Sequence, residues 1–273
     1  MGVNPLVDRA VQATAYAAAA CRAAESRRPR PRLSDPLAEL FTPSGAAAQV
    51  ARLADAGLDE VVGRTVLIDR MLAEALDRWP GAAVVNLGAG FCTRPYRMRL
   101  PGCRETVEAD DPAVIELKSR ALHGRQPTCP VRRVGLDVRD ETAVTAVVDE
   151  AGRSGDVIVV TEGLLVYLPT GAVTALAATL TSRTAVVHWL ADIVSEGSAR
   201  QMRTIAGRVP GGLSLFGLDS LAPLEEPGWQ VVGYRALPVS RLRYGPAPGV
   251  TSRALVDGVV ALDRAGFRRT VSG

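Results

Sequence analysis

The sequence predicts an α/β fold in which a doubly wound, mainly parallel sheet carries helices on both faces. From residue 82 onward, short apolar runs alternate with segments of helical periodicity, which is typical of strand–helix–strand units. The first apolar run ends in Gly88-Ala89-Gly90, a glycine turn placed directly after a strand. The content of 47% hydrophobic and 22% charged residues is ordinary for a globular chain.

The length of 273 residues fits one such domain with an added cap, although two small domains would also fit. We expect a single domain over residues 1–273. Its first part, residues 1–80, is predicted to form a helical cap, and residues 81–273 the Rossmann-like core. A Gly-, Pro- and Leu-rich stretch at 208–228 is predicted to be a surface loop or lid.

The cap begins with an Ala-rich helix at 6–26. The run RRPRPR at 27–32 cannot continue this helix, because proline lacks the backbone N–H and restricts the residue before it. Residues 46–79 are predicted to form two more helices. The second of them, 65–79, carries apolar residues at helical spacing at positions 66, 68, 72, 75 and 76.

The core is predicted to contain seven strands separated by helices. The strand candidates lie at 82–87, 106–109, 131–136, 157–160, 185–190, 229–234 and about 254–261. The helix candidates between them lie at 112–122, 142–151, 172–180 and 196–206.

The composition argues against several classes of function. A net charge of +3 is too small to indicate a nucleic-acid partner, and we interpret the 27–32 run as a solvated loop. The four cysteines form no C-x-x-C pair and there are only two histidines, so no metal site is expected. No apolar stretch approaches the length of a membrane span, and without an export signal we expect the cytoplasm.

The glycine turn and a downstream acid predict a nucleoside site. Asp110, with Glu108 just before it, stands twenty residues after Gly90 at the end of the second strand, where a carboxylate can accept both ribose hydroxyls. The position at which a dinucleotide fingerprint has its third glycine is Thr93. A nucleoside without phosphate therefore fits better, and S-adenosylmethionine is the common one. A purely structural turn is the alternative.

Two further carboxylates end neighbouring strands. Asp137 follows the third strand, where it could accept from an adenine amino group or cap the next helix. Glu162 ends the fourth strand at the centre of the expected cleft. Because a buried carboxylate without a partner is costly, Glu162 is predicted to face a cation, which the sulfonium donor with its ammonium would supply.

These segments together resemble the leucine carboxyl methyltransferase family over about residues 10–190. The matching motifs in the core are VNLGAG at 85–90, TRPYR at 93–97, EAD at 108–110, DP at 111–112 with Lys118, and EGLLVYL at 162–168. In the cap they are CRAAE at 21–25, SDPLA at 34–38, and Arg64 with ID at 68–69. The resemblance is greatest to bacterial members that methylate small molecules, including aromatic polyketides.

The resemblance implies a class I methyltransferase fold, with a seven-stranded sheet whose last strand is antiparallel. It implies that Arg64 binds the carboxylate of the methionine moiety and that Arg22 lies near the acceptor or that carboxylate. The implied donor contacts are the glycine loop of Gly88, Ala89 and Gly90 beneath the methionine, Asp110 at the ribose, Asp137 at the adenine and Glu162 at the amino group. One departure is Cys92, where the family usually has Asp.

The acceptor is expected to be a small molecule, most simply a natural-product or metabolic carboxylic acid. A carboxylate is ionised at neutral pH and needs no general base, whereas a phenol would benefit from one. His188, expected near the end of the fifth strand, is the candidate base, although a satisfied core histidine is the alternative. Methylation of a protein C-terminal carboxylate, methylation of RNA and donor binding without catalysis are the competing hypotheses.

Overall fold

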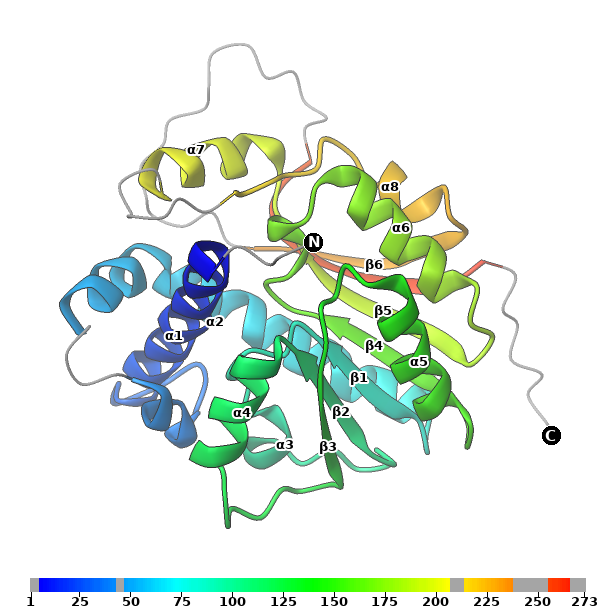
Figure 1. Ribbon diagram of the computed structural model, residues 1–273, viewed down its shortest axis with the longest axis horizontal. Coiled ribbons are helices and arrows are strands. Elements are labelled where there is room, and N and C mark those ends of the chain that lie inside the picture. Colours follow the sequence, from blue (N-terminus) through cyan, green and yellow to red (C-terminus); the bar gives the residue numbers. More distant parts are fainter. Residues whose placement is uncertain (1–4, 43–46, 207–213, 238–254, 266–273) are drawn as a thin grey trace.

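The computed structural model describes residues 5–42, 47–206, 214–237 and 255–265. Its centre is a seven-stranded sheet of order β3-β2-β1-β4-β5-β7-β6 (Figure 1). The strands are β1 (Ala83–Leu87), β2 (Thr106–Asp110), β3 (Val131–Gly135), β4 (Val157–Thr161), β5 (Val186–Ile193), β6 (Trp229–Ala236) and β7 (Gly258–Arg264). Strands β1 to β5 are parallel and β7 runs antiparallel to β5, so the predicted sheet with its last strand antiparallel is confirmed.

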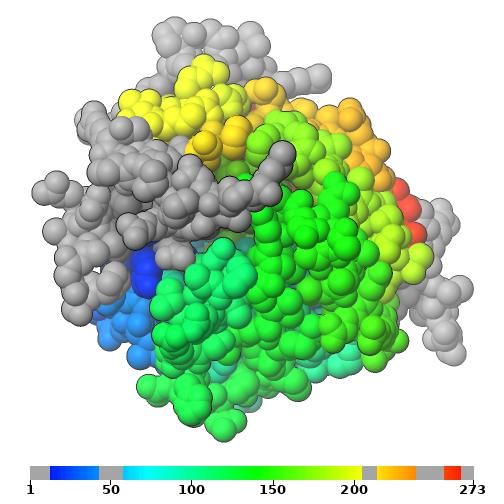
Figure 2. Space-filling view, in the orientation of Figure 1, coloured from blue at the N-terminus to red at the C-terminus, as the bar shows by residue number. Residues whose placement is uncertain are grey.

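Two helical layers cover the sheet. One face packs against α5 (Glu141–Gly152), α6 (Thr170–Thr181) and α8 (Ala222–Glu225). The other face packs against α2 (Ala47–Arg78), with α4 (Pro112–Ala121) over its β2–β3 end. Figure 2 shows α5 and α6 next to each other at the surface in green. Every residue of β1, β4 and β5 is buried, as expected for central parallel strands with helices on both sides.

The cap consists of α1 (Pro5–Ser26), the short 3₁₀ helix η1 (Pro36–Phe41) and α2, and α1 packs along α2 (Figure 1). The remaining helical segments are α3 (Arg94–Arg97), the 3₁₀ turn η2 (Leu165–Tyr167) and α7 (Glu196–Ala206). Among the described residues, no helix combines the length and the apolar character needed to cross a bilayer.

Three sequence predictions need correction or completion. Where two helices were predicted over 46–79, α2 is one helix over Ala47–Arg78, because no proline interrupts it and its interior accommodates Gly63. Strand β5 continues to Ile193 instead of ending at 190. The first part of the expected lid, residues 208–213, lies outside the described residues. The described part is packed, with Leu215, Leu218 and Leu224 buried.

Strand order reverses at β1, which pairs with β2 on one side and β4 on the other. In open parallel sheets, ligands bind beyond the carboxyl ends of the strands at such a reversal. The loop after β1 and the ends of β2, β4 and β5 are therefore the place to look for a site.

Candidate functional site

The glycine loop after β1 is built as a tight turn. Gly88 and Gly90 have φ of +67° and +42°, values that L side chains rarely adopt. A Cβ on Gly88 would also lie 3.0 Å from the Leu164 side chain. The Gly88 and Ala89 N–H groups donate to the Ala109 carbonyl at 2.9 and 3.1 Å, which fixes the loop to β2.

Asp110 ends β2 directly beside this loop. Its carboxylate accepts the N–H of Gly90 at 2.6 Å and the N–H of Asp111 at 2.7 Å. Burial raises the pKa of Asp110, and these two hydrogen bonds act in the opposite direction. Each carboxylate oxygen has a second lone pair, so a fixed and partly exposed Asp110 can still accept two hydroxyl groups.

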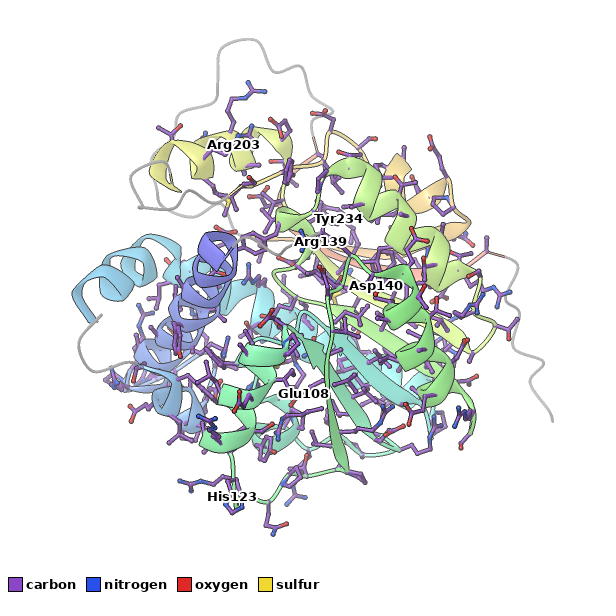
Figure 3. All side chains as sticks on the ribbon, viewed as in Figure 1. Glu108, His123, Arg139, Asp140, Arg203 and Tyr234 are labelled. Carbon is purple, nitrogen blue, oxygen red and sulfur yellow. The ribbon has the colours of Figure 1, made fainter. Side chains whose placement is uncertain are left out.

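Glu108 is fully buried beneath the loop, and this corrects the expectation that it contacts a ligand (Figure 3). Lys118 Nζ lies 2.8 Å from its Oε1, and Arg133 Nε donates to its Oε2 at 2.9 Å. Lys118 also donates to the Ala89 carbonyl at 3.4 Å. Glu108 therefore supports the glycine loop through Lys118.

Glu162 lies at the end of β4 with its carboxylate held from two sides. Thr65 Oγ1 donates to Oε1 at 2.5 Å and Arg94 Nη2 donates to Oε2 at 2.6 Å. Burial alone would raise the pKa of Glu162, but Arg94 and Arg64 together with the Thr65 hydrogen bond lower it to about 2. Glu162 is thus a fixed negative charge at neutral pH.

Arg64 reaches from α2 to the ends of β4 and β5. Its guanidinium lies 3.8 Å from Glu162 and 3.4 Å from Asp192, and a Cβ on Gly163 would come within 2.6 Å of Nη2. Asp192 is held in turn by the N–H of Gly163 at 2.6 Å. Within the part of the chain that the structure describes, the buried Nε of Arg64 makes no hydrogen bond, and it lies 3.8 Å from Glu162 Oε1.

These groups belong to a larger charge network that the sequence did not predict. Consecutive ion pairs of 2.6 to 3.8 Å connect Arg22, Asp35, Arg97, Asp69, Arg94, Glu162, Arg64 and Asp192. Thr93 adds a hydrogen bond to Asp35 at 2.5 Å. The network joins the cap to the glycine loop and to strands β4 and β5. Of its unpredicted members, Asp69, Arg94 and Arg97 lay in motifs that matched the family, but their pairing appears only in three dimensions.

Arg22 is placed as a support rather than at an open surface. Its Nε donates to Asp35 at 2.9 Å and its Nη2 donates to the Phe91 carbonyl at 2.8 Å, and the residue is 5% exposed. With both contacts satisfied within the protein, Arg22 orients the end of the glycine loop. The structure does not bring it into contact with an acceptor.

His188 lies in the first half of β5, because the strand continues to Ile193. Its Nδ1 is 2.7 Å from Asp263 Oδ1 and its ring lies 4.6 Å from the ring of Trp79. The residue is 5% exposed. The expected position at the strand end is corrected: His188 is a satisfied core side chain several residues away from the carboxyl ends of the strands.

Asp137 and Cys92 occupy the remaining predicted positions. Asp137 lies beyond β3 and pairs with Arg139 at 2.6 Å, which lowers its pKa, and it remains accessible at the surface. A largely apolar cavity of about 190 Å³ begins next to it, between α5 and α6. Cys92 receives a hydrogen bond from Arg94 Nη1 at 3.3 Å, so a thiol accepts where the family usually offers a carboxylate.

A second group of acids lies on the far side of Arg64. Glu60 is one helical turn before Arg64, and burial, with the nearby Asp257 and Asp192, raises its pKa. Burial likewise raises the pKa of Asp192 and that of Tyr167, although a hydrogen bond with Thr14 opposes the latter shift. Within the part of the chain that the structure describes, no group of three or more His, Cys, Asp or Glu side chains is arranged to hold a metal.

Comparison with known proteins assigns the chain to a family. The leucine carboxyl methyltransferase family model matches residues 15–181. The chain belongs to this family. A relative from Mycobacterium marinum, named "Putative S-adenosyl-L-methionine-dependent methyltransferase", is 32% identical over 80% of this chain and 78% of its own length. A relative of the same name from Mycolicibacterium smegmatis is 31% identical over 81% and 84%, respectively.

Solved structures with the same fold are more distant in sequence. A magnesium protoporphyrin IX methyltransferase from Synechocystis PCC 6803 with bound SAH has a TM-score of 0.51 at 12% identity, covering 83% of this chain and 92% of that one. A DUF574 family protein from Streptomyces avermitilis also has a TM-score of 0.51, at 10% identity, covering 84% and 95%. At this identity the likeness establishes the class I methyltransferase fold alone.

Proposed function

We propose that this chain transfers the methyl group of S-adenosylmethionine to an oxygen of a small organic acceptor, forming the methyl ester of a natural-product or metabolic carboxylic acid. One observation carries the proposal: Asp110, Glu162 and Arg64 lie along one edge of the sheet, and the Nε of Arg64 makes no hydrogen bond to the described residues. They match, in kind, the ribose hydroxyls, the ammonium and the carboxylate of the donor.

The residues present fit this donor better than a dinucleotide. The loop after β1 has the two glycines that a close backbone approach requires, and Thr93, where a dinucleotide site has its third glycine, is fully buried against Asp35. Asp137 remains accessible beyond β3 and would hold the adenine amino group.

The donor, when bound, supplies a methyl carbon activated by sulfonium. What remains for the protein is to align the acceptor oxygen with that carbon and to exclude water. Glu162 and Arg64 are suited to orientation, because both are largely shielded from solvent and bonded to cap and sheet. A carboxylate acceptor is ionised at neutral pH, so this reaction needs no general base.

A hydroxyl acceptor is the second candidate, and one observation favours it. Burial raises the pKa of both Glu60, in the middle of α2, and Asp192, near the end of β5, and both lie near Tyr167. A carboxylate whose pKa is raised toward neutrality is better matched to removing a phenolic proton. In this reaction Glu60 or Asp192 would serve as the base in place of His188.

The test is a calorimetric titration with S-adenosylmethionine, followed by an acceptor screen. We expect binding by the native chain, a loss of at least about tenfold in Asp110→Asn, and no change in Asp149→Asn, an exposed carboxylate paired with Arg183 on the far side of the core. Absence of binding by the folded native chain would contradict the proposal. Binding without turnover on any acceptor would indicate a non-catalytic donor-binding protein.

The screen compares carboxylic acids, phenols and peptides with a free C-terminus, using donor labelled in its methyl group. Methyl esters release the label as methanol in mild alkali, whereas aryl ethers do not, so the product itself identifies the oxygen. Alkali-stable label on phenols alone would replace the ester proposal with the second candidate. Label on peptides alone would identify a protein carboxyl methyltransferase.

A further inference from the structure

Two thiols that the proposed reaction does not use meet at the opposite end of the sheet. Cys103 precedes β2 and Cys129 precedes β3, and both sulfurs approach the hydroxyl of Thr106, at 3.8 and 3.3 Å respectively. The Cys103 thiol also donates to the Glu105 carbonyl at 3.2 Å, which fixes its position beside Thr106. The pair therefore lies within side-chain contact although the residues are far apart in sequence.

Hydrogen bonds hold the backbone on both sides of this thiol pair. Thr128 donates its N–H to the Pro95 carbonyl at 2.7 Å and its hydroxyl to the Met98 carbonyl at 2.6 Å. The N–H of Thr106 donates to the Pro130 carbonyl at 2.8 Å. These bonds hold the loop before β3 against the turn that carries Cys103.

The surroundings divide the thiols into a nucleophile and its partner. The hydrogen bond from Cys103 lowers the pKa of Cys129 to about 6, and a hydrogen bond with Thr106 adds to this. The same contact raises the pKa of Cys103. Cys129 is 8% exposed and Cys103 is partly exposed, which admits a reagent as small as a peroxide.

We propose that Cys103 and Cys129 are a modification site, where a hydroperoxide converts the two thiols into a disulfide. The Cys129 thiolate attacks the distal peroxide oxygen, the O–O bond breaks, and the alkoxide leaves with a proton as the alcohol. The resulting sulfenic acid is attacked by the sulfur of Cys103, which loses its proton as water departs. Two thiols and one hydroperoxide give one disulfide, one alcohol and one water.

The bond would close a loop over residues 103–129, which contains β2, Asp110 and α4. Thr106 and Asp110 are the first and last residues of β2, so the cross-link and the proposed donor site lie at opposite ends of the strand. The modification should therefore raise stability through the closed loop and leave donor affinity nearly unchanged.

Peptide mapping tests the proposal on the native full-length chain. The protein is exposed to hydrogen peroxide, its free thiols are blocked with iodoacetamide, and it is digested with trypsin without reductant. Cleavage after arginine releases Cys103 in LPGCR, residues 100–104, and Cys129 in QPTCPVR, residues 126–132. We expect these two peptides joined, with a mass lower by two hydrogens, and separated again by dithiothreitol.

Cys103→Ser and Cys129→Ser should each abolish the joined peptide, whereas the matched Cys92→Ser should retain it. The oxidised native chain should unfold at a temperature higher by on the order of 5 °C, reversibly with reductant. Recovery of both peptides alkylated and separate after peroxide treatment would overturn the proposal. So would joining of either peptide to the Cys92 peptide, residues 79–97, instead. Because the native chain gives the decisive map, the result does not depend on how the variants fold.

Discussion

Glu162→Gln should destabilise the folded chain through the loss of one negative charge between two arginines. The pKa of Glu162 falls from its ordinary value of 4.5 to about 2. This difference corresponds to about 3 kcal/mol of stabilisation of the ionised form by the folded structure. The variant also leaves Arg94 paired only with Asp69 and Arg64 only with Asp192, and breaking a buried ion pair typically costs about 3–5 kcal/mol. We therefore expect the free energy of unfolding at pH 7 to fall by about 3 kcal/mol.

The pH dependence follows from the direction of this pKa change. The contribution of Glu162 is fully present above about pH 4.5, where the unfolded chain is also ionised, and is lost as pH falls toward about 2. Urea unfolding of both chains, followed between pH 7 and pH 3, should show their difference in stability shrinking as the acid range is entered.

The control is Glu116→Gln, which removes the exposed partner of Arg120 on α4 and should change stability by less than about 1 kcal/mol. The reasoning would be refuted by a Glu162→Gln chain as stable as the native one at pH 7. A difference that stays constant down to pH 3 would equally exclude ionisation as its cause.

Three other variants probe the structure elsewhere. Gly163→Ala places a Cβ 2.6 Å from Arg64 Nη2 at a φ of +66°. The free energy of unfolding, measured by thermal unfolding, should fall by about 1–3 kcal/mol, and donor binding should weaken. A donor affinity equal to that of the native chain would exclude a role for this contact in placing Arg64. Lys118→Met leaves Glu108 paired only with Arg133, and the free energy of unfolding in urea should fall by about 3–5 kcal/mol. An unchanged free energy of unfolding would mean that Arg133 alone is enough to stabilise the buried charge of Glu108. His188→Gln should lower stability but retain kcat within about threefold on the acceptor found in the screen, whereas a loss near the 10²-fold typical of a general base would restore its catalytic assignment.

The positions of the strands and of the glycine turn after β1 could be predicted from the sequence because they depend on local patterns. Apolar runs of strand length located β1 and β4, and the glycines that follow β1 have the positive φ that only glycine adopts readily. The end of β5 was predicted too early because the charged Asp192 interrupts the apolar run that continues to Ile193. That charge is stabilised by Arg64 and the N–H of Gly163, which lie far away in sequence.

The same limit explains the errors at the site. Glu108 and Asp110 are two residues apart on one strand, so their side chains point to the same side, and both were assigned to the ligand. Burial separates them, because Lys118 of α4 covers Glu108 whereas Asp110 lies at the strand end. Arg22 was likewise given a ligand before its contact with Asp35 could be known. Charges that pair across long sequence separations carry no local pattern.

The charge network has a consequence for how caps and cores could be exchanged between relatives during evolution or in chimaeric enzymes. The cap contributes two positive and two negative side chains to it, and the core contributes the same: Arg22, Arg64, Asp35 and Asp69 from the cap, and Arg94, Arg97, Glu162 and Asp192 from the core. Each half is neutral, yet most of the ion pairs cross the junction. A cap taken from a relative that differs at any of these four cap positions would therefore leave charged side chains of the core without their partners. This would happen even if the net charge of the network stayed the same.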